Sequence, residues 1–290
     1  MPKPQLQPVY LEGPAGRLFA ILVAPAPDQA TNLGVVYLPP FGEEMNRSRR
    51  MATLQARSLA AAGVSVLLLD LFGTGESDGD FVDARWEIWR EDVAVALRFL
   101  EQRGCSRRLL WGLRTGALLA AEVAADSASS VRDLVLWQPL PSGDAMINNL
   151  LRTRVAAAMD GSEPPVTTAA LRATLGRGES IEISGYEVAP ALAAALGSSR
   201  LEDCRLPSGA SVRWLEIAAE AGRPLAPASQ RLTAAWREAG LTVVSEVVAG
   251  EPFWALQEIT LAPSLLDATL RSIHGSFPER ARDRFSMSGR

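Results

Sequence analysis

The chain has 290 residues, of which 48% are hydrophobic and 21% charged, so it can bury a large core without long disordered segments. Its net charge of -4 and isoelectric point near 5.3 give no long-range attraction to nucleic acid or to an anionic membrane. We see no secretory signal and no apolar run near the roughly 18 residues of a membrane span, so we expect a cytoplasmic protein.

Apolar runs of strand length alternate with helical patterns along most of the chain. The expected strands are 18–24, 35–38, 64–69, 109–111, 134–137, 212–218 and 243–248. The expected helices between them include 49–62, 84–103 and 117–125. Such alternation is typical of crossover connections, so the sequence predicts an α/β fold with a mainly parallel central sheet flanked by helices.

The alternation of strands and helices stops between residue 139 and about residue 206. Helical patterns replace it at 145–159, 167–175 and 190–196. Because ligands of parallel α/β sheets bind beyond the carboxyl ends of the strands, we expect this helical insertion to cap the site. The predicted organisation is a first part of the core at 1–139, a helical cap insertion at 140–206 and a second part of the core at 207–290.

A proline-rich loop follows the strand predicted at 35–38. Two backbone N–H groups aimed at one oxygen would stabilise a developing negative charge there. Pro39 and Pro40 have no N–H, so the donors would have to come from Phe41 or Gly42. A rigid turn that leads into a helix explains the same residues equally well.

A glycine-rich loop, residues 70–79, follows the strand predicted at 64–69. It lacks the lysine of a phosphate-binding P-loop, which favours a structural role. Glycines permit a tight course with positive φ, and Asp70 can end the strand and fix the turn by hydrogen bonds. Ser77 is a conceivable nucleophile, but it fits a turn residue better.

The segment Gly112 to Gly116 has the strand, tight turn and helix layout in which a nucleophile commonly sits. Arg114 occupies the nucleophile position, and arginine stays protonated and cannot attack a carbonyl. Its charge and the following helix N-terminus, beginning at Thr115, would favour a bound carboxylate or phosphate. Alternatively, Glu43 or Glu44 pairs with Arg114 and neutralises it.

These motifs support a family resemblance. Asp-x-x-Gly-x-Gly-x-Ser at 70–77 and the Gly-x-x-x-Gly turn resemble the α/β-hydrolase superfamily over most of the chain. Three longer blocks are similar to the second hydrolase associated with the exosortase A system: PPFGEEMNRSRRM at 39–51, WGLRTGALLA at 111–120 and LWQP at 136–139. The resemblance implies a bacterial, cytoplasmic protein with the α/β-hydrolase fold, whose genes accompany exosortase and exopolysaccharide functions. It supplies no substrate.

The remaining positions of a catalytic triad are not filled in the usual way. Where a hydrolase places its histidine, the chain has the aromatic pair Phe253 and Trp254. The single histidine, His274, lies roughly 18 Å along a final helix that starts near residue 262. Glu220 could fill the acid position, but it has no histidine to orient.

Three functions remain open. The first is a non-hydrolytic binding or accessory protein whose cavity holds a small anionic or acyl ligand between Arg114 and the rings of Phe41, Phe253 and Trp254. The second is an unconventional hydrolase or acyltransferase acting on an ester or thioester, with Glu43, Glu44 or Glu220 activating water. The third is an interaction module in the exopolysaccharide machinery, in which the pocket is a relic.

The sequence gives no sign of a cofactor or a metal site. The two cysteines, Cys105 and Cys204, have neither metal-ligand spacing nor the pattern of a disulfide framework. The oligomeric state is left open.

Overall fold

The structure is a computed structural model that describes residues 4–126, 128–159 and 165–274. Within these residues, the centre is an eight-stranded sheet in the order β1-β2-β4-β3-β5-β6-β9-β10. The strands are β1 Gln5–Glu12, β2 Arg17–Ala24, β3 Leu33–Leu38, β4 Ser65–Leu69, β5 Arg107–Leu113, β6 Asp133–Trp137, β9 Ser211–Ala218 and β10 Thr242–Ala249. Neighbouring strands are parallel from β4 to β10, whereas β2 is antiparallel to both β1 and β4.

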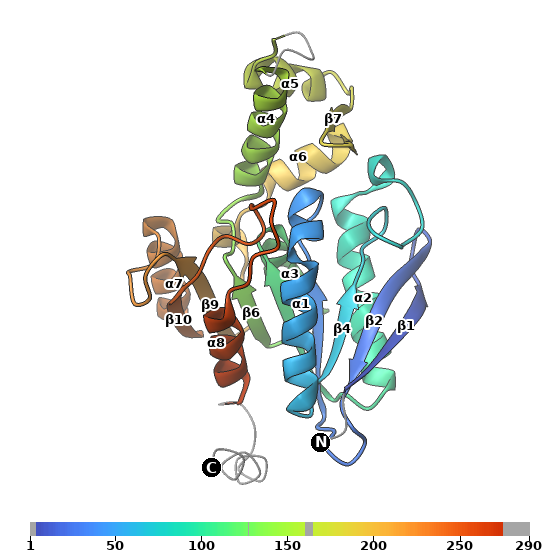
Figure 1. The fold of residues 1–290 in the computed structure, drawn as a ribbon, viewed down its shortest axis with the longest axis vertical. Helices are drawn as coiled ribbons and strands as arrows, with labels where there is room; N and C mark the ends of the chain where they lie inside the picture. Colours follow the sequence, from blue (N-terminus) through green and yellow to red (C-terminus); the bar gives the residue numbers. More distant parts are fainter. Residues whose placement is uncertain (1–3, 127, 160–164, 275–290) are drawn as a thin grey trace.

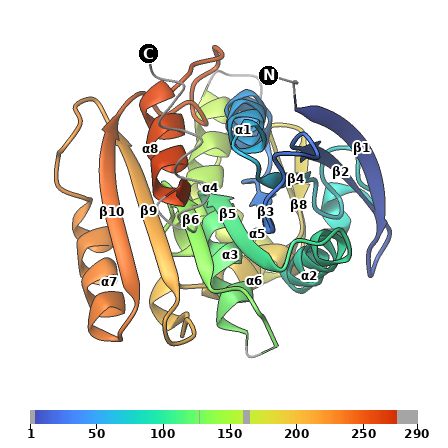
Figure 2. The same cartoon turned by 90° about the horizontal axis from the view of Figure 1, so that it is seen from below.

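Helices cover both faces of the sheet. The core helices are α1 Glu43–Ala61, α2 Trp86–Gln102, α3 Thr115–Ala125, α7 Pro227–Glu238 and α8 Pro263–His274. Figure 2 shows α1 and α8 on one face and α2, α3 and α7 on the other. Because the central strands are covered on both faces, β3, β5 and β6 carry runs of apolar residues, and all six residues of β3 are buried. The predicted α/β fold class, a mainly parallel sheet flanked by helices, is confirmed.

The first strand was not predicted. Its segment, Gln5–Glu12, interrupts its apolar residues with Gln5, Gln7 and Glu12 and contains Pro8, which cannot donate to a strand ladder. The structure places β1 at the outer edge of the sheet, where β2 is its one partner strand among the described residues. An edge strand needs just one set of ladder hydrogen bonds and one buried face, so both the proline and the polar residues are tolerated there.

Helix α1 begins at Glu43, six residues before the predicted start at residue 49. Gly42, with φ of 63°, precedes it, and Glu43 and Glu44 occupy its first turn. Acidic side chains at a helix N-terminus interact favourably with the helix dipole, which explains why this polar segment is helical. Helix α1 therefore starts directly at the end of the sheet.

Between β6 and β9 the chain leaves the sheet and builds a cap. The cap comprises α4 Gly143–Met159, α5 Thr168–Gly176, the hairpin of β7 Ile181–Ile183 and β8 Tyr186–Val188, and α6 Pro190–Ser198. Figure 1 shows these elements above the end of the sheet at which α1 begins. The predicted helices of this segment are present, but the hairpin was not foreseen because its two strands have only three residues each.

None of the helices in the described part of the chain combines the length and apolar character that spanning a membrane would require.

Candidate functional site

The turn between β5 and α3 has the geometry of a nucleophile elbow. Arg114 adopts φ of 57° and ψ of -114°, a backbone conformation that an L-residue holds only under strain. The flanking glycines permit the close contact of strand and helix. A Cβ on Gly112 would clash with the carbonyl oxygen of Gly116, and one on Gly116 would clash with that of Leu38.

The Arg114 side chain forms a two-point ion pair with Glu44 of α1. Its Nη2 donates to Glu44 Oε1 at 3.0 Å, and its Nε donates to Glu44 Oε2 at 3.2 Å. Only 12% of the arginine side chain and 17% of the glutamate side chain are exposed. Of the two partners left open by the sequence, the structure thus uses Glu44. The predicted free anion site at Arg114 is occupied by an internal carboxylate.

The loop after β10 supplies one wall of the site. The guanidinium carbon of Arg114 lies 5.5 Å from the ring centroid of Trp254, within the range of a cation–π contact. Phe253, in contrast, is 1% exposed and packs against Trp137 and Trp254 in the core between the sheet, α1 and α8. The expectation that Phe253 forms a wall of the ligand cavity is therefore wrong, because its ring points into the core.

The loop between β3 and α1 keeps backbone donors free. Within the described residues, no hydrogen bond uses the N–H of Phe41, Gly42 or Thr115. The residue after an elbow and the loop after the third strand are the two sources of N–H groups in an oxyanion hole. The Phe41 side chain packs against Phe81 and Trp89 and also borders the cavity.

Core and cap together line a cavity of about 330 Å³. The core contributes Phe41, Gly42, Glu43, Glu44, Arg47, Phe81, Arg114, Trp254 and Ala255. The cap contributes Met146, Asn149, Leu150, Arg152, Thr153, Ile183, Ser184, Tyr186 and Val188. Its size is that of a small-molecule site, and its lining is divided between apolar residues and polar or charged ones.

The other predicted carboxylates are placed differently. Glu43 borders the cavity and pairs with Arg47 one turn further along α1, at 3.3 Å. Glu220 is exposed in the loop after β9 and does not border the cavity. The structure therefore does not bring Glu220 into the site, because its loop turns toward solvent.

Thr115 also differs from its expected position. Its side chain is 2% exposed, does not border the cavity, and its Oγ1 has no hydrogen-bond partner among the described residues. A ligand contact from Thr115 could come only from its backbone N–H, at the N-terminus of α3.

The loop 70–79 is closed on itself by hydrogen bonds. Asp70 Oδ2 accepts from the backbone N–H of Glu76 and from Arg49 Nη2. The Ser77 hydroxyl donates to the Asp70 carbonyl oxygen and accepts from the Phe19 N–H. Ser77 is thus tied to the turn, in keeping with the structural role predicted for this loop.

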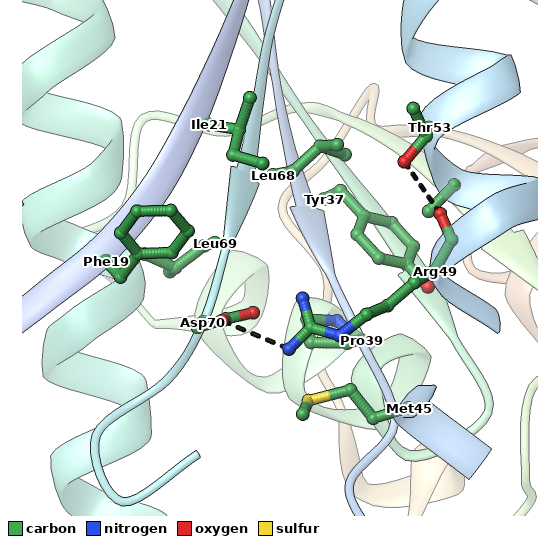
Figure 3. A pocket seen from close by; sticks show the side chains of 11 residues that line it. Phe19, Ile21, Tyr37, Pro39, Met45, Arg49, Thr53, Leu68, Leu69 and Asp70 are labelled. Carbon is green, nitrogen blue, oxygen red and sulfur yellow. Dashed lines mark hydrogen bonds and ion pairs between the residues drawn. The ribbon is translucent and has the colours of Figure 1, made fainter. Parts of the chain in front are cut away.

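A smaller cavity of about 150 Å³ lies between α1 and strands β2, β3 and β4 (Figure 3). Figure 3 shows the ion pair of Arg49 and Asp70 beside it, together with the ring of Tyr37. The Tyr37 hydroxyl is buried and has no hydrogen-bond partner among the described residues, and burial raises its pKa. Pro39 and Met45 line this cavity, whereas the residues between them that border a cavity, Phe41 to Glu44, border the larger one.

Three other titratable groups are buried away from the cavity. Burial raises the pKa of Asp92, on α2, to about 7, although its Oδ2 accepts from the Phe72 N–H at 2.9 Å. Burial also raises the pKa of both free thiols, that of Cys204 to about 12. Such thiols are poor nucleophiles. Within the described ranges, no group of three histidine, cysteine or carboxylate side chains is placed to hold a metal ion.

The side chain of His274 lies outside the described part of the structure, but its residue ends α8. Figure 1 shows α8 running away from the cap.

Sequence reasoning missed the residues that the cap contributes. Tyr186 of β8 accepts a hydrogen bond from Asn46 Nδ2 at 2.8 Å and packs edge-on against Phe81. Asn46 and Tyr186 are 140 positions apart in sequence, so no local pattern could have paired them. Arg152 and Asn149 of α4 were missed as well, since polar residues on an amphipathic helix usually face solvent.

Comparisons with known proteins agree with this fold. Residues 34–168 match the family model described as serine aminopeptidase, S33. No curated protein sequence matches the chain. The architecture and these similarities define the α/β-hydrolase fold.

Several solved structures share the fold at low sequence identity. Est1E from Butyrivibrio proteoclasticus, with ferulic acid bound, has a TM-score of 0.64 at 15% identity, over 92% of this chain and 98% of its own. A serine hydrolase without a lid from Xanthomonas campestris gives 0.57 at 16% identity, over 94% and 96%. An α/β hydrolase from Vibrio vulnificus gives 0.58 at 20% identity, over 93% and 80%.

Proposed function

We propose that this chain is a non-hydrolytic ligand-binding or accessory protein, whose capped cavity holds a small anionic or acyl molecule. The observation that carries the proposal is the ion pair of Arg114 and Glu44 at the nucleophile position. An arginine there cannot form an acyl intermediate, and both oxygens of Glu44 are engaged by the guanidinium.

The position that a hydrolase gives to its histidine supports the same proposal. Trp254 stands there and its ring contacts Arg114, so the space needed by a general base is filled by an indole. An indole has one N–H donor and no acceptor, so it cannot take a proton from water or from a hydroxyl group. Binding needs only the enclosed volume and the apolar walls, both of which are present.

The cellular setting proposed here follows from sequence resemblance. The blocks at 39–51, 111–120 and 136–139 resemble the second hydrolase associated with the exosortase A system. We place the protein in the cytoplasm, in association with exopolysaccharide functions.

One observation favours an unconventional hydrolase or acyltransferase as a second candidate. The N–H groups of Phe41, Gly42 and Thr115 form no hydrogen bond within the described residues, as donors of an oxyanion hole would require. Such an enzyme would still need a base. Glu43 is the better placed carboxylate, because it borders the cavity and holds its arginine through a single ion pair.

The decisive experiment measures hydrolysis of activated acyl esters and thioesters by purified wild-type protein, Glu43→Gln and Arg114→Lys. Arg114→Lys keeps a cation opposite Glu44 and is less disruptive than removal of the charge. We expect no turnover in any of the three, while calorimetry with the same acyl compounds detects binding by the wild type.

Turnover that disappears in Glu43→Gln or Arg114→Lys, with the fold confirmed by circular dichroism, would establish the enzyme instead. Equal turnover in all three proteins would identify a contaminating esterase. Neither turnover nor binding would point to the interaction module, with the cavity as a relic.

A further inference from the structure

The cavity is bordered by three arginines, and two of them are already engaged. Arg114 is held by Glu44, while Arg47 donates to Glu43 and to the carbonyl oxygen of Ala255. Arg152, on helix α4 of the cap, forms no ion pair and no hydrogen bond within the described part of the chain. The available cation of the cavity is therefore contributed by the cap and not by the elbow.

The charges that border the cavity are unbalanced by one. Three arginines face two glutamates, Glu43 and Glu44, so the lining carries one uncompensated positive charge. A ligand with a single negative charge would neutralise it, whereas a phosphate dianion would leave an excess negative charge beside both glutamates. A guanidinium presents a planar pair of donors that matches a carboxylate.

The rest of the lining is suited to an apolar chain. Aromatic and aliphatic side chains from both core and cap form the walls: Phe41, Phe81, Trp254, Met146, Leu150, Ile183 and Val188. At roughly 30 Å³ for each heavy atom, by analogy with the volume of water, about 330 Å³ accommodates on the order of ten non-hydrogen atoms. Octanoate has about this size.

We propose that the cavity takes a medium-length acyl monocarboxylate, whose carboxylate is bound by Arg152 of the cap. The acyl chain lies against the aromatic and aliphatic walls, and the ion pair of Arg114 and Glu44 stays intact. Asn149, which borders the cavity from the same helix, offers a further donor to the carboxylate through its side-chain amide, whereas the Thr153 hydroxyl already donates to the Asn149 carbonyl oxygen. This inference rests on the proposed function and identifies its ligand class and its anchor.

The test is isothermal titration calorimetry of the full chain with octanoate, 1-octanol and octyl phosphate. Arg152→Gln removes the cation and keeps a long polar side chain. Arg50→Gln is the matched control, because Arg50 is an exposed arginine of α1 that does not border the cavity.

Octanoate affinity should fall by about tenfold or more in Arg152→Gln, as expected for loss of a charged hydrogen bond, and stay unchanged in Arg50→Gln. Octanol affinity should be the same in all three proteins.

Several outcomes would overturn the inference while sparing the proposed function. One is octanoate binding that is unchanged in Arg152→Gln but weakened in Arg114→Lys. This result would assign the carboxylate to Arg114 at the elbow. Another is tighter binding of octyl phosphate than of octanoate at pH 7.5, which would exclude selectivity for a monoanion. If the wild type binds neither octanoate nor octanol, the proposed function fails together with the inference.

Discussion

Two loops at the carboxyl end of the sheet use their polar groups in opposite ways. In the loop 70–79, the carboxylate of Asp70 and the hydroxyl of Ser77 are consumed by bonds within the turn and to its neighbours. In the loop between β3 and α1, the N–H groups of Phe41 and Gly42 stay free within the described residues, next to a cavity. The first loop holds the fold together, and the second is available to a ligand.

The Arg114–Glu44 pair shares features of both loops. It borders the cavity like the free donors, yet it joins two elements of the core, as the polar groups of the loop 70–79 do. Whether it belongs with the structural groups or with the ligand site can be decided by measuring stability.

Removing one partner of the elbow pair should destabilise the fold most. Arg114→Ala leaves Glu44 with an uncompensated charge at 17% exposure, and we expect a loss of about 3 to 5 kcal/mol in the free energy of unfolding. Urea denaturation monitored by circular dichroism measures it.

The double variant Arg114→Ala with Glu44→Ala is the control for this pair. Because it leaves no unpaired charge, it should be more stable than Arg114→Ala alone. A single variant as stable as the wild type would place the pair with the ligand site and not with the structural groups.

Protonation of Asp92 should control how firmly α2 holds the loop 70–79. Its pKa is raised to about 7 in the folded protein, against about 3.9 in an unfolded chain. The folded state thus binds the proton more tightly, so the contribution of Asp92 to stability is fully present below about pH 4 and is lost as the pH rises to about 7. The amide introduced by Asp92→Asn cannot ionise, so the variant has no such dependence at this position.

The stability difference between Asp92→Asn and the wild type should therefore shift in favour of the variant by up to about 4 kcal/mol between pH 4 and pH 8. Urea denaturation of both proteins across this range measures the difference, and other titrating groups cancel in the comparison. A difference that is independent of pH would contradict the raised pKa.

The smallest effect is expected where cap and core touch. Tyr186→Phe removes the hydrogen bond from Asn46 and keeps the ring contact with Phe81, so the loss of stability should be about 0.5 to 1.5 kcal/mol. Hydrogen exchange should show faster opening of residues 181–188, while exchange in α3 stays as in the wild type. Unchanged exchange in the hairpin would mean that the ring contact alone closes the cap.

Much of the fold could be predicted from the sequence, because strands that helices cover on both faces appear in it as continuous apolar runs. The runs at 35–38, 109–111 and 134–137 are apolar without interruption, and they form β3, β5 and β6 at the centre of the sheet. The edge strand β1 has no such apolar run. It has only one buried face, so it tolerates Pro8 and polar residues. The start of α1 was missed because the stabilisation of Glu43 and Glu44 by the helix dipole does not depend on hydrophobic periodicity.

The site was harder to predict than the fold. The elbow could be located, since its glycines and its strand-to-helix context are local in sequence. The orientation of neighbouring rings could not, and Phe253 and Trp254, adjacent in the chain, point into the core and to the cavity respectively. The cap residues Arg152 and Tyr186 meet the core only through the tertiary fold, so no motif marks them.

The elbow also shows how a scaffold can separate its geometry from its chemistry. The backbone contacts at Gly112 and Gly116 leave no room for any side chain, so these two positions set the turn. Arg114, between them, bears its conformational strain whatever its side chain is, and its side chain borders the cavity. A single substitution at this position can therefore replace one reactive or binding group by another without rebuilding the turn. The same backbone can thus present side chains of different chemistry to the cavity.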